Sequence, residues 1–416
     1  SVTGTDLAPR ELLSPELDRL GIKIVTGTHE GVAFEDADLV VVSPGVPPIP
    51  ELDTAVDGGA VVLSELELAW RFLDDVALVA VGGTNGKSTT TTLVGELLSA
   101  GDLRTFVGGH LGTPASEAVG GHWDAVVLEV SSFQLERAPT FRPRVALLLN
   151  ITEDHLDRYP TFPAYASAKG NAFVNQTSDD YAIVPFGDMA CEEQARRGHG
   201  PLLSFGSAGD YTVQGSAIEE SSSGERYELG ESGLHGRHNY ENAAAAIAAA
   251  RCLDVSPGAV RRGLDRFEPL PHRMALVGTI DGVRFYDDSK GTNVGAAVTA
   301  LSGLAEEKGV LIAGGRDKLG SYEPLVAALR EKGRAVVVIG EAAERIVAAI
   351  ADALPVSHAT SIEDAVRCAF AAARKGDAVL LSPACSSFDM FKSYSERGDR
   401  FAQAVAELAH ERREAR

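Results

Sequence analysis

The sequence predicts an α/β protein built from three units, with boundaries near residue 74 and near residue 270. Three observations lead to this prediction. The chain has 416 residues, more than one ordinary domain of about 150 residues. Short apolar runs alternate with helical stretches, as parallel sheets covered by helices require. After the stretch FEPLPHR, which ends at Arg273, the same alternation restarts, as it would in a separate unit.

The first apolar runs are short and end at polar turns. The run LVVVSPG at 39–45 predicts a buried strand that a Pro-Gly turn ends. The run VALVAV at 76–81 predicts a strand that leads into a glycine-rich loop, and residues 90–100 then predict a helix. Two more apolar runs, at 125–130 and 145–150, predict further strands. Together these elements predict a parallel sheet in the middle of the chain.

A different pattern follows in residues 204–233. Short alternating stretches with Gly and Ser turns predict β-hairpins there. The stretch ENAAAAIAAARCL at 241–253 then predicts a helix whose alanines allow close packing, with Asn242 near its start. In the last unit, strands are predicted at 310–315, 335–340 and 378–382.

Composition excludes several classes of protein. The net charge is −21, from 38 basic and 59 acidic residues, and no basic stripe with interleaved aromatics is present, so we expect no nucleic-acid partner. No run of about 18 apolar residues and no secretory leader pattern occurs, so we expect no membrane partner. The four cysteines lack C-x-x-C spacing, which disfavours a zinc site and a disulfide scaffold. A reducing cytoplasm fits this composition.

The stretch VGGTNGKSTT is similar to a phosphate-binding loop. The common pattern G-x-x-x-x-G-K-[ST] has glycine where this chain has Val81. The stretch follows a predicted strand and opens a helix, so the backbone N–H groups of residues 85–89 would point at phosphate oxygens. Lys87 would reach the outer phosphates, and Ser88 or Thr89 would hold Mg²⁺. The alternative is a simple glycine turn, which the Gly-Lys-Ser-Thr sequence in this context disfavours.

Polar residues also follow the next two predicted strands. Glu129 ends a buried run, where a carboxylate is costly unless it is paired or binds a metal. It is a candidate Mg²⁺ ligand, and a solvated strand end or an ion pair is the alternative. The cluster NITEDHLDRY at 150–159 would lie at the carboxyl edge of the sheet, where α/β folds bind ligands. Its His155 is a candidate second metal ligand, although a single histidine is more often structural. Lys169 alone reads as a solvated helix charge.

Polar clusters end the predicted strands of the last unit as well. They are HR at 272–273, DDSKGTN at 287–293, GGRDK at 314–318 and SPACSSFDMFKSYSERGDRF at 382–401. Each cluster alone is equally consistent with a helix cap. Together they predict a second ligand-binding rim.

These motifs resemble the Mur ligase family, the ATP-dependent amide-bond ligases of peptidoglycan assembly, over about residues 40–416. The loop GTNGKST has the family's form, so Val81 is no damage to it. The stretches SSFQLE, TEDHLDRY, DDSKGTN and SPACSSFDMFKSYSERGDRF occur in the family's order. Within the family they are most similar to members that add D-glutamate.

The resemblance implies three domains. Residues 1–74 would form a Rossmann-like domain that binds a UDP-sugar, although the family's first strand and glycine turn have no counterpart in the chain. Residues 75–269 would form a P-loop ATPase-type domain, a parallel sheet with a small β-subregion. Residues 270–416 would form a Rossmann-like domain that binds D-glutamate.

The resemblance also implies a reaction. The γ-phosphate of ATP would move to the L-alanine carboxylate of UDP-N-acetylmuramoyl-L-alanine, which gives an acyl phosphate. The amine of D-glutamate would attack it through a tetrahedral intermediate, and phosphate would leave. A carboxylate is a poor acyl donor and two anions must meet, so two Mg²⁺ ions and lysines would offset their repulsion. We expect a monomer in the cytoplasm.

Individual roles follow from the resemblance. Those implied for ATP fall on Gly83, Thr84, Asn85, Gly86, Lys87, Ser88, Thr89, Asn239 (less favourably Asn242), Arg273 and Asp288. Those implied for magnesium fall on Ser88, Glu129, His155 and Lys169, the last as a carbamate that turns a cation into an anionic ligand. Those implied for the UDP-sugar or D-glutamate fall on Ser43, Gly45, His110, Thr292, Lys318, Ser387, Phe388 and Tyr394. The expected catalytic residues are Lys87, His155, Lys169 and Lys290.

Two departures and two alternatives accompany this interpretation. His110 stands where the family pattern has Asn, and Tyr394 stands where it has Phe. One alternative is a sibling enzyme, another Mur ligase or a folylpolyglutamate synthetase, but the stretch SSFDMFKSYSERG favours the D-glutamate adder. The other is a P-loop switch that hydrolyses ATP without forming a bond. That alternative leaves the polar rim of the last unit unexplained.

Overall fold

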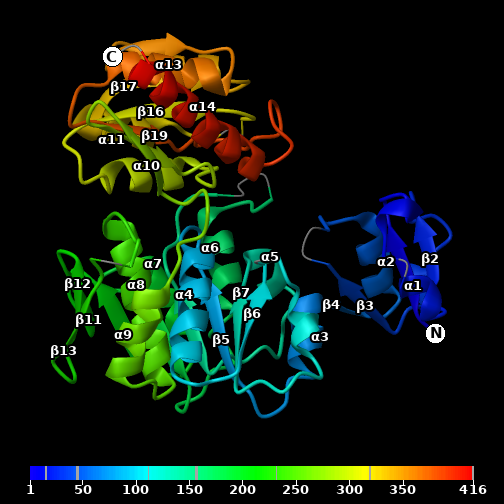
Figure 1. Ribbon diagram of the computed structural model, residues 1–416. Helices are drawn as coiled ribbons and strands as arrows, with labels where there is room; N and C mark the ends of the chain where they lie inside the picture. Colours follow the sequence, from blue (N-terminus) through cyan, green and yellow to red (C-terminus); the bar gives the residue numbers. More distant parts are fainter. Residues whose placement is uncertain are drawn as a thin grey trace.

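The structure is a computed structural model that describes residues 1–14, 16–43, 46–110, 112–154, 158–230, 232–317 and 320–414. These residues form four β-sheets, most of whose strands are parallel, with helices packed against them. Figure 1 shows a small N-terminal part, a central part and a C-terminal part that faces the central one. The predicted α/β class is therefore confirmed. None of the described helices has the length and apolarity needed to span a membrane.

Within the described residues, the central sheet has nine strands in the order β13-β12-β11-β10-β9-β8-β5-β7-β6. These are β5 (Ala77–Gly82), β6 (Thr105–Gly109), β7 (Ala125–Glu129), β8 (Val145–Leu148), β9 (Tyr181–Pro185), β10 (Leu202–Gly206), β11 (Tyr211–Gln214), β12 (Ala217–Glu220) and β13 (Glu225–Glu228). Strand β5 pairs in parallel with both β7 and β8. The loops after β5, β7 and β8 therefore start side by side at one edge of the sheet.

The hairpin prediction for residues 204–233 is right for three strands and wrong for one. Strands β11, β12 and β13 form two antiparallel hairpins at the edge of the central sheet. Residues 204–206 instead belong to β10, which runs parallel to β9. Helix α7 (Met189–Ala195) connects these two strands, and a helical crossover places the second strand parallel to the first. The small β-subregion is therefore an extension of the central sheet.

Helices cover both faces of the central sheet. One face carries α4 (Lys87–Ala100), α8 (Arg237–Cys252) and α9 (Pro257–Arg266). The other carries α3 (Glu65–Trp70), the 3-10 helix η3 (Ala115–Ala118), α5 (Ser132–Leu135), α6 (Phe162–Gly170) and α7. Alanines 243–246 and 248–250 of α8 are fully buried, as close packing requires. Helices α4 and α8 begin at Lys87 and Arg237, three and four residues before the predicted starts at 90 and 241.

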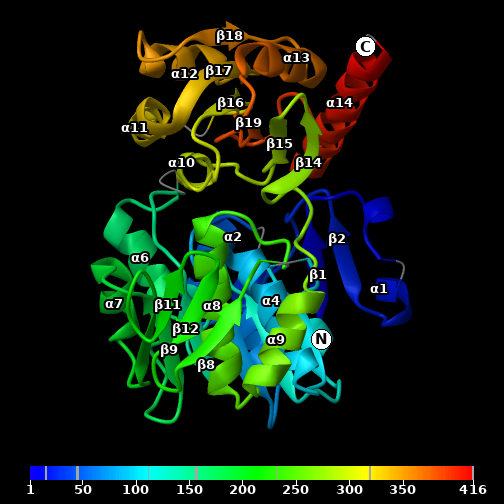
Figure 2. The ribbon, with the colours of Figure 1, turned by 60° about the vertical axis from the view of Figure 1, so that its left-hand side comes forward.

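The C-terminal sheet has six strands in the described residues, in the order β14-β15-β19-β16-β17-β18. They are β14 (Ala275–Ile280), β15 (Val283–Asp287), β16 (Gly309–Gly314), β17 (Gly333–Ile339), β18 (Val356–His358) and β19 (Ala378–Leu381). All pairs except β14–β15 are parallel. Helices α10 (Val294–Ser302), α11 (Glu323–Lys332) and α12 (Ala343–Ile350) cover one face, and α13 (Ile362–Ala372) and α14 (Tyr394–Glu414) the other (Figure 2). This is the expected Rossmann-like arrangement.

The N-terminal part contains two separate pairs of parallel strands. They are β1 (Thr3–Asp6) with β2 (Lys23–Thr26), and β3 (Leu39–Val42) with β4 (Val61–Ser64). The short helices are η1 (Arg10–Leu12), α1 (Glu16–Arg19), η2 (Phe34–Asp36) and α2 (Pro50–Asp57). The burial predicted for the strand at 39–45 is wrong, because Leu39 and Val41 remain 45% and 39% exposed. Among the described residues β3 pairs with β4 alone, which leaves its other edge uncovered.

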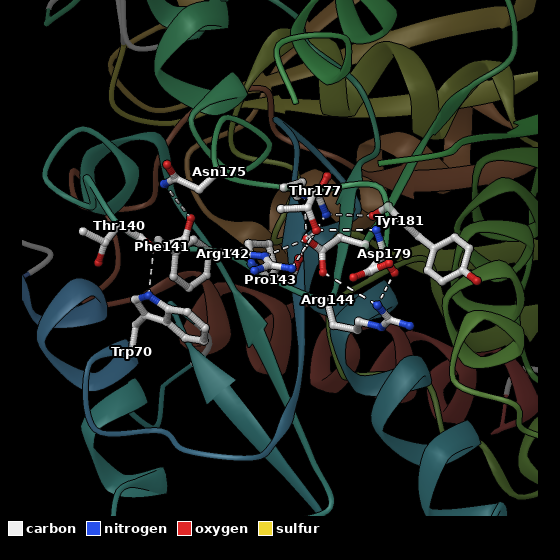
Figure 3. A network of polar contacts seen from close by, with 12 residues as sticks. Trp70, Thr140, Phe141, Arg142, Pro143, Arg144, Asn175, Thr177, Asp179 and Tyr181 are labelled. Carbon is white, nitrogen blue, oxygen red and sulfur yellow. Dashed lines mark hydrogen bonds and ion pairs between the residues drawn. The ribbon is translucent and has the colours of Figure 1, made fainter. Parts of the chain in front are cut away.

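A polar network fastens the amino ends of β8 and β9, at the edge of the sheet opposite to the three loops (Figure 3). Arg142 Nε donates to Asp180 Oδ2 over 2.7 Å, and Arg142 Nη2 donates to Thr177 Oγ1 over 2.7 Å. The backbone N–H of Thr177 also donates to Asp180, which is buried. Nearby, Trp70 Nε1 donates to the carbonyl oxygen of Thr140. These contacts tie together segments that are up to 70 residues apart.

Replacing Asp180 with alanine is expected to lower the free energy of unfolding by about 2 kcal/mol, because it leaves a charged donor and a backbone donor without their acceptor. The midpoint of urea unfolding measures this. Glu228→Ala is the matched control, since it breaks an exposed ion pair with Arg226 in the same sheet and should change the midpoint little. Equal midpoints for the two variants would contradict a stabilising role for the network.

Candidate active site

The glycine loop after β5 has the geometry of a phosphate-binding turn. Val81 is fully buried inside β5, and its carbonyl oxygen accepts a bond from Val130 N over 3.0 Å. The chain turns only at Gly83, where φ is 144°, so no glycine is needed at 81. Gly86 has φ 84°, and a Cβ atom there would collide with the amide of Asn242 on α8. The loop can therefore adopt this path only with glycine at 86.

Groups from the segment after β8 and from α6 brace this loop. Asn85 N donates to Asn150 Oδ1 over 2.9 Å, and Asn150 Nδ2 donates back to the carbonyl oxygen of Asn85 over 3.0 Å. The Thr84 hydroxyl lies 3.2 Å from the Tyr165 hydroxyl and accepts from Thr152 N over 3.1 Å. The loop is thus held in place before any ligand binds, which lowers the cost of ordering it on binding. We did not assign this bracing to Asn150 from the sequence.

Two lysines donate to the loop's own carbonyl oxygens. Lys87 Nζ donates to Thr84 O over 2.9 Å, and Lys169 Nζ donates to Gly83 O over 2.7 Å. Lys169 is 4% exposed, and its ammonium lies 4.5 Å from the centre of the Tyr165 ring. Burial lowers the pKa of Lys87, and burial together with the charge of Lys87 lowers the pKa of Lys169 well below its usual range. The charged form of Lys169 is therefore less favourable here than on an exposed lysine.

Glu129 places an unused acceptor beside these cations. It ends β7 and is 4% exposed, and its Oε2 atom is buried without a hydrogen-bond partner among the described residues. Its charge raises the pKa of both Lys87 and Lys169 against the effect of burial. A buried carboxylate oxygen of this kind suits a hard cation such as Mg²⁺. Ser88, buried at the start of α4, supplies a hydroxyl of the kind that phosphate loops offer to Mg²⁺.

A pocket of about 490 Å³, counted out to its open mouth, separates the loop from the C-terminal part. Its lining consists of Asn85, Gly86, Thr89, His238, Asn239, Asn242, Arg273, Met274, Asp288, Lys290, Gly291, Ala296, Thr299 and Ala300. Burial lowers the pKa of His238 to about 4, so this ring is neutral at pH 7. The sequence analysis missed His238 as a pocket residue, although it directly precedes Asn239 in the HNY stretch. Asn242 lines the pocket beside Asn239, and its Nδ2 atom donates to Asn239 Oδ1 over 3.3 Å.

The opposite wall of the pocket comes from the C-terminal part. Ser382 Oγ donates to Asp288 Oδ2 over 2.7 Å. Burial raises the pKa of Asp288 to about 7, against the lowering effects of Ser382 and Arg273. Lys290 Nζ lies 4.2 Å from the centre of the Tyr394 ring. The cations Arg273 and Lys290 and the carboxyl group of Asp288 thus face the glycine loop across a single pocket.

One asparagine connects the two walls directly. Asn293 Nδ2 donates to Asn85 Oδ1 and to Asp154 Oδ2, each over 3.2 Å. Its Oδ1 atom accepts from Ala296 N over 2.8 Å and so caps α10. The C-terminal part therefore contacts the phosphate-type loop itself.

The remaining predicted residues divide into two groups. Thr292, Ser387 and Tyr394 lie in the segments that follow β15 and β19, which Ala384 N joins by donating to Gly291 O and Ser289 Oγ by donating to Tyr394 O. Phe388 is there too, with its side chain exposed. Elsewhere, His110 is exposed and its backbone N–H donates to Glu129 O, and Ser43 is exposed on the N-terminal part. The predicted residues Gly45, His155 and Lys318 lie outside the described residues.

Family models match most of the chain. The model described as the Mur ligase middle domain matches residues 81–250. The model described as the Mur ligase, glutamate ligase domain matches residues 272–385. The first match includes the glycine loop and Asn239, and the second includes Arg273, Asp288 and Lys290.

Curated relatives are similar over almost the whole chain. One from Trichlorobacter lovleyi is 44% identical over 420 residues, covering 98% of this chain and 93% of the relative. One from Myxococcus xanthus is 44% identical over 408 residues, covering 94% and 89%. Both are named UDP-N-acetylmuramoylalanine–D-glutamate ligase.

Solved structures share the fold. The MurF ligase from Thermotoga maritima in complex with ADP has a TM-score of 0.64 at 20% identity, over 91% of this chain and 99% of that one. The folylpolyglutamate synthase from Mycobacterium tuberculosis complexed with ADP has a TM-score of 0.61 at 16% identity, over 81% and 93%. At these identities the likeness concerns the fold. Together with the two family models and the 44% identical relatives, it shows that this chain belongs to the Mur ligase family.

Proposed function

We propose that this chain uses ATP to add D-glutamate to UDP-N-acetylmuramoyl-L-alanine, in the synthesis of peptidoglycan precursors. The observation that carries the proposal is the pocket in which the glycine loop faces Arg273, Asp288 and Lys290. The curated relatives, which cover nearly the whole chain, are named for this D-glutamate-adding reaction. The sibling ligases share the fold at 16–20% identity, far below the 44% of those relatives.

ATP lies in the pocket, with its phosphates on the loop. The N–H groups of Asn85 to Thr89 and the start of α4 attract the phosphate oxygens. Lys87, which donates to a loop carbonyl among the described residues, turns to the outer phosphates. Asn239 and Asn242 offer amides to the nucleoside side of the pocket, and Arg273 and Lys290 offset the phosphate charge from the other wall.

Glu129 and Ser88 are the described residues that would hold magnesium, together with His155 and a modified Lys169. The unpartnered Oε2 atom of Glu129 supports this assignment. Magnesium would neutralise phosphate charge and keep the reacting oxygens in line. Lys169 reacts with carbon dioxide through its neutral amine: an N–C bond forms, one proton leaves to solvent, and a carbamate anion results. The lowered pKa of Lys169 supports this step.

The other two substrates are assigned to the flanking domains. We place the domain boundaries near 74 and 270, because β5 opens the central sheet at Ala77 and β14 opens the C-terminal sheet at Ala275. The UDP-sugar approaches from the N-terminal domain, with Ser43, Gly45 and His110 as contacts. D-glutamate binds at the carboxyl edge of the C-terminal sheet, with Thr292, Lys318, Ser387, Phe388 and Tyr394 as contacts. We expect the enzyme to work as a monomer in the cytoplasm, which its four free cysteines fit.

The test is phosphate release from Mg-ATP, with UDP-N-acetylmuramoyl-L-alanine and D-glutamate each left out in turn. We expect release that needs all three substrates, because the amine acceptor must trap the acyl phosphate. Release independent of any amine acceptor would instead identify an ATPase switch. A panel of amino acids in place of D-glutamate separates the sibling ligases, since a preference for another amino acid would overturn the assigned acceptor.

Activity is expected to depend on the ionisation of Asp288. With a pKa of about 7, this carboxyl is mostly protonated at pH 6 and mostly ionised at pH 8. The ionised form interacts favourably with Arg273 and shapes the nucleotide side of the pocket. We therefore expect kcat/KM for ATP to fall as the pH is lowered through 7, and Asp288→Asn to be weakly active without this fall. If kcat/KM of Asp288→Asn fell below pH 7 in the same way as that of the unaltered chain, the assignment would be contradicted.

The same group is expected to lower stability at high pH. Its pKa in the folded protein lies above the usual 3.8, so the stability that it contributes is present below pH 3.8 and is lost as the pH rises through about 7. Asp288→Asn should therefore raise the urea midpoint at pH 8 relative to the unaltered chain. If Asp288→Asn loses activity and gains stability, the role of Asp288 is functional and not structural.

A further inference from the structure

Arg397 on α14 is a fully buried cation. No carboxylate in the described part of the chain forms an ion pair with it within 4.0 Å, although the charges of Asp389, Asp287 and Asp288 act on it from further away. Arginine is rarely buried to this extent unless it is paired, because an isolated charge is costly to remove from water. Burial lowers the pKa of Arg397 to about 10, which still leaves it charged at neutral pH. This cost calls for a compensating role.

The guanidinium group of Arg397 donates hydrogen bonds to two loops. Nε donates to Ser289 Oγ over 2.9 Å, and Nη2 donates to Ser289 O over 2.8 Å. Nη1 donates to the carbonyl oxygen of Cys385 over 3.2 Å. A third loop closes over it, because a Cβ atom on Gly315 would lie 3.2 Å from Nη1. The planar, fixed fork of arginine suits such simultaneous contacts, which the point charge of a lysine does not reproduce.

These loops carry the proposed ligand residues of the C-terminal domain. Ser289 stands between Asp288 and Lys290, on the ATP side. Cys385 stands two residues before Ser387, on the proposed D-glutamate side. Both loops leave adjacent parallel strands, β15 and β19. Arg397 is therefore a buried link between the two loops, in addition to the Ser382–Asp288 and Ala384–Gly291 hydrogen bonds.

We propose that Arg397 is a positioning residue that holds the ATP-side loop and the D-glutamate-side loop in one fixed arrangement. This inference rests on the proposed function. It follows that Arg397 touches neither substrate and acts on both through Ser289 and Cys385. The UDP-sugar, assigned to the N-terminal domain, lies outside its influence.

Arg397→Lys keeps the charge and removes the fork. We expect the KM values for ATP and for D-glutamate each to rise by about tenfold, because small displacements of contact groups are costly. The KM for UDP-N-acetylmuramoyl-L-alanine should stay unchanged. Initial rates of phosphate release, with each substrate varied in turn, measure all three. Ser289→Ala removes one accepting hydroxyl and should move the same two KM values in the same direction, by less.

Phe401→Leu is the matched control. Phe401 lies one turn further along α14, is fully buried, and packs in the apolar core away from the loops. It should lower the urea midpoint and leave every KM unchanged. The proposal would be overturned if Arg397→Lys left the KM values for ATP and D-glutamate unchanged, as this control should. It would also be overturned if only one of these two KM values rose. If Arg397→Lys does not fold, the KM values of Ser289→Ala decide in the same way.

The unaltered chain is assayed first, so that the two ideas can fail separately. Absence of D-glutamate-dependent phosphate release there would count against the proposed function. Calorimetric binding of ATP and of D-glutamate to the unaltered chain and to Arg397→Lys would then decide the inference. A joint loss of affinity would support it, and equal affinities would overturn it.

Discussion

Replacing Lys87 with alanine is expected to reduce ATP-dependent phosphate release by about 10³-fold, because a preorganised charge at a developing anion supplies a large share of the rate. The structure explains why this one lysine matters. It opens α4 directly after Gly86, and its ammonium rests on Thr84 O, a contact that it can exchange for a phosphate. The initial rate with all three substrates at saturating concentration measures the effect.

Two further variants make this test specific. Lys87→Arg keeps a cation but changes its shape, so it should recover part of the rate. Lys308→Ala removes a partly exposed lysine whose Nζ donates to Glu331 O on α11, and it should leave the rate unchanged. Near-normal activity of Lys87→Ala would remove the glycine loop from the ATP site.

The candidate site was predictable where its residues are close together in the chain. The glycine loop and Glu129 could be predicted, because a strand end and a glycine pattern are local signals. The roles of Asn150 and Asn293 were not predictable, since each depends on contacts with Asn85 from 65 and 208 residues away. The roles proposed for His155 and Lys318 stay predictions, because these residues lie outside the described ranges.

The strands of the fold, too, were predictable where the signal lies within a short stretch of the chain. The central and C-terminal strands were predictable because their apolar runs are buried on both faces between helices. The burial of Leu39 and Val41 was predicted wrongly, because burial of a strand depends on its neighbours as well as on its own sequence. Residues 204–206 were predicted as part of a hairpin, but the crossover helix α7 makes their strand parallel. The connection between two strands, a short polar turn or a helical crossover, therefore sets whether they run antiparallel or parallel. The alternation of residues within each strand does not.

Replacing Lys169 with alanine is expected to leave almost no activity, with partial recovery when a short carboxylate such as acetate is added. The reason is the environment of this amine. It is buried, it lies near the charge of Lys87, and its pKa is lowered, so as a cation it is repelled by Lys87 and is a poor neighbour for a metal ion. As the proposed carbamate it would be an anion able to hold magnesium together with Glu129, and added acetate would supply a similar oxygen. The rate of phosphate release with and without acetate measures this.

Stability separates this role from a structural one. Because the pKa of Lys169 is lower in the folded protein than the usual 10.5, the unfolded chain binds more protons than the folded one between the lowered pKa and 10.5, and the free energy of unfolding rises with pH over that range. Lys169→Met keeps an apolar chain of similar length and removes the buried amine, so its urea midpoint at pH 7 should not fall. Carbon-13 NMR with labelled carbon dioxide should show a carbamate signal in the unaltered chain and none in Lys169→Met. Full activity of Lys169→Ala without any additive would contradict the carbamate, and would mean that Glu129 and its neighbours hold the metal alone.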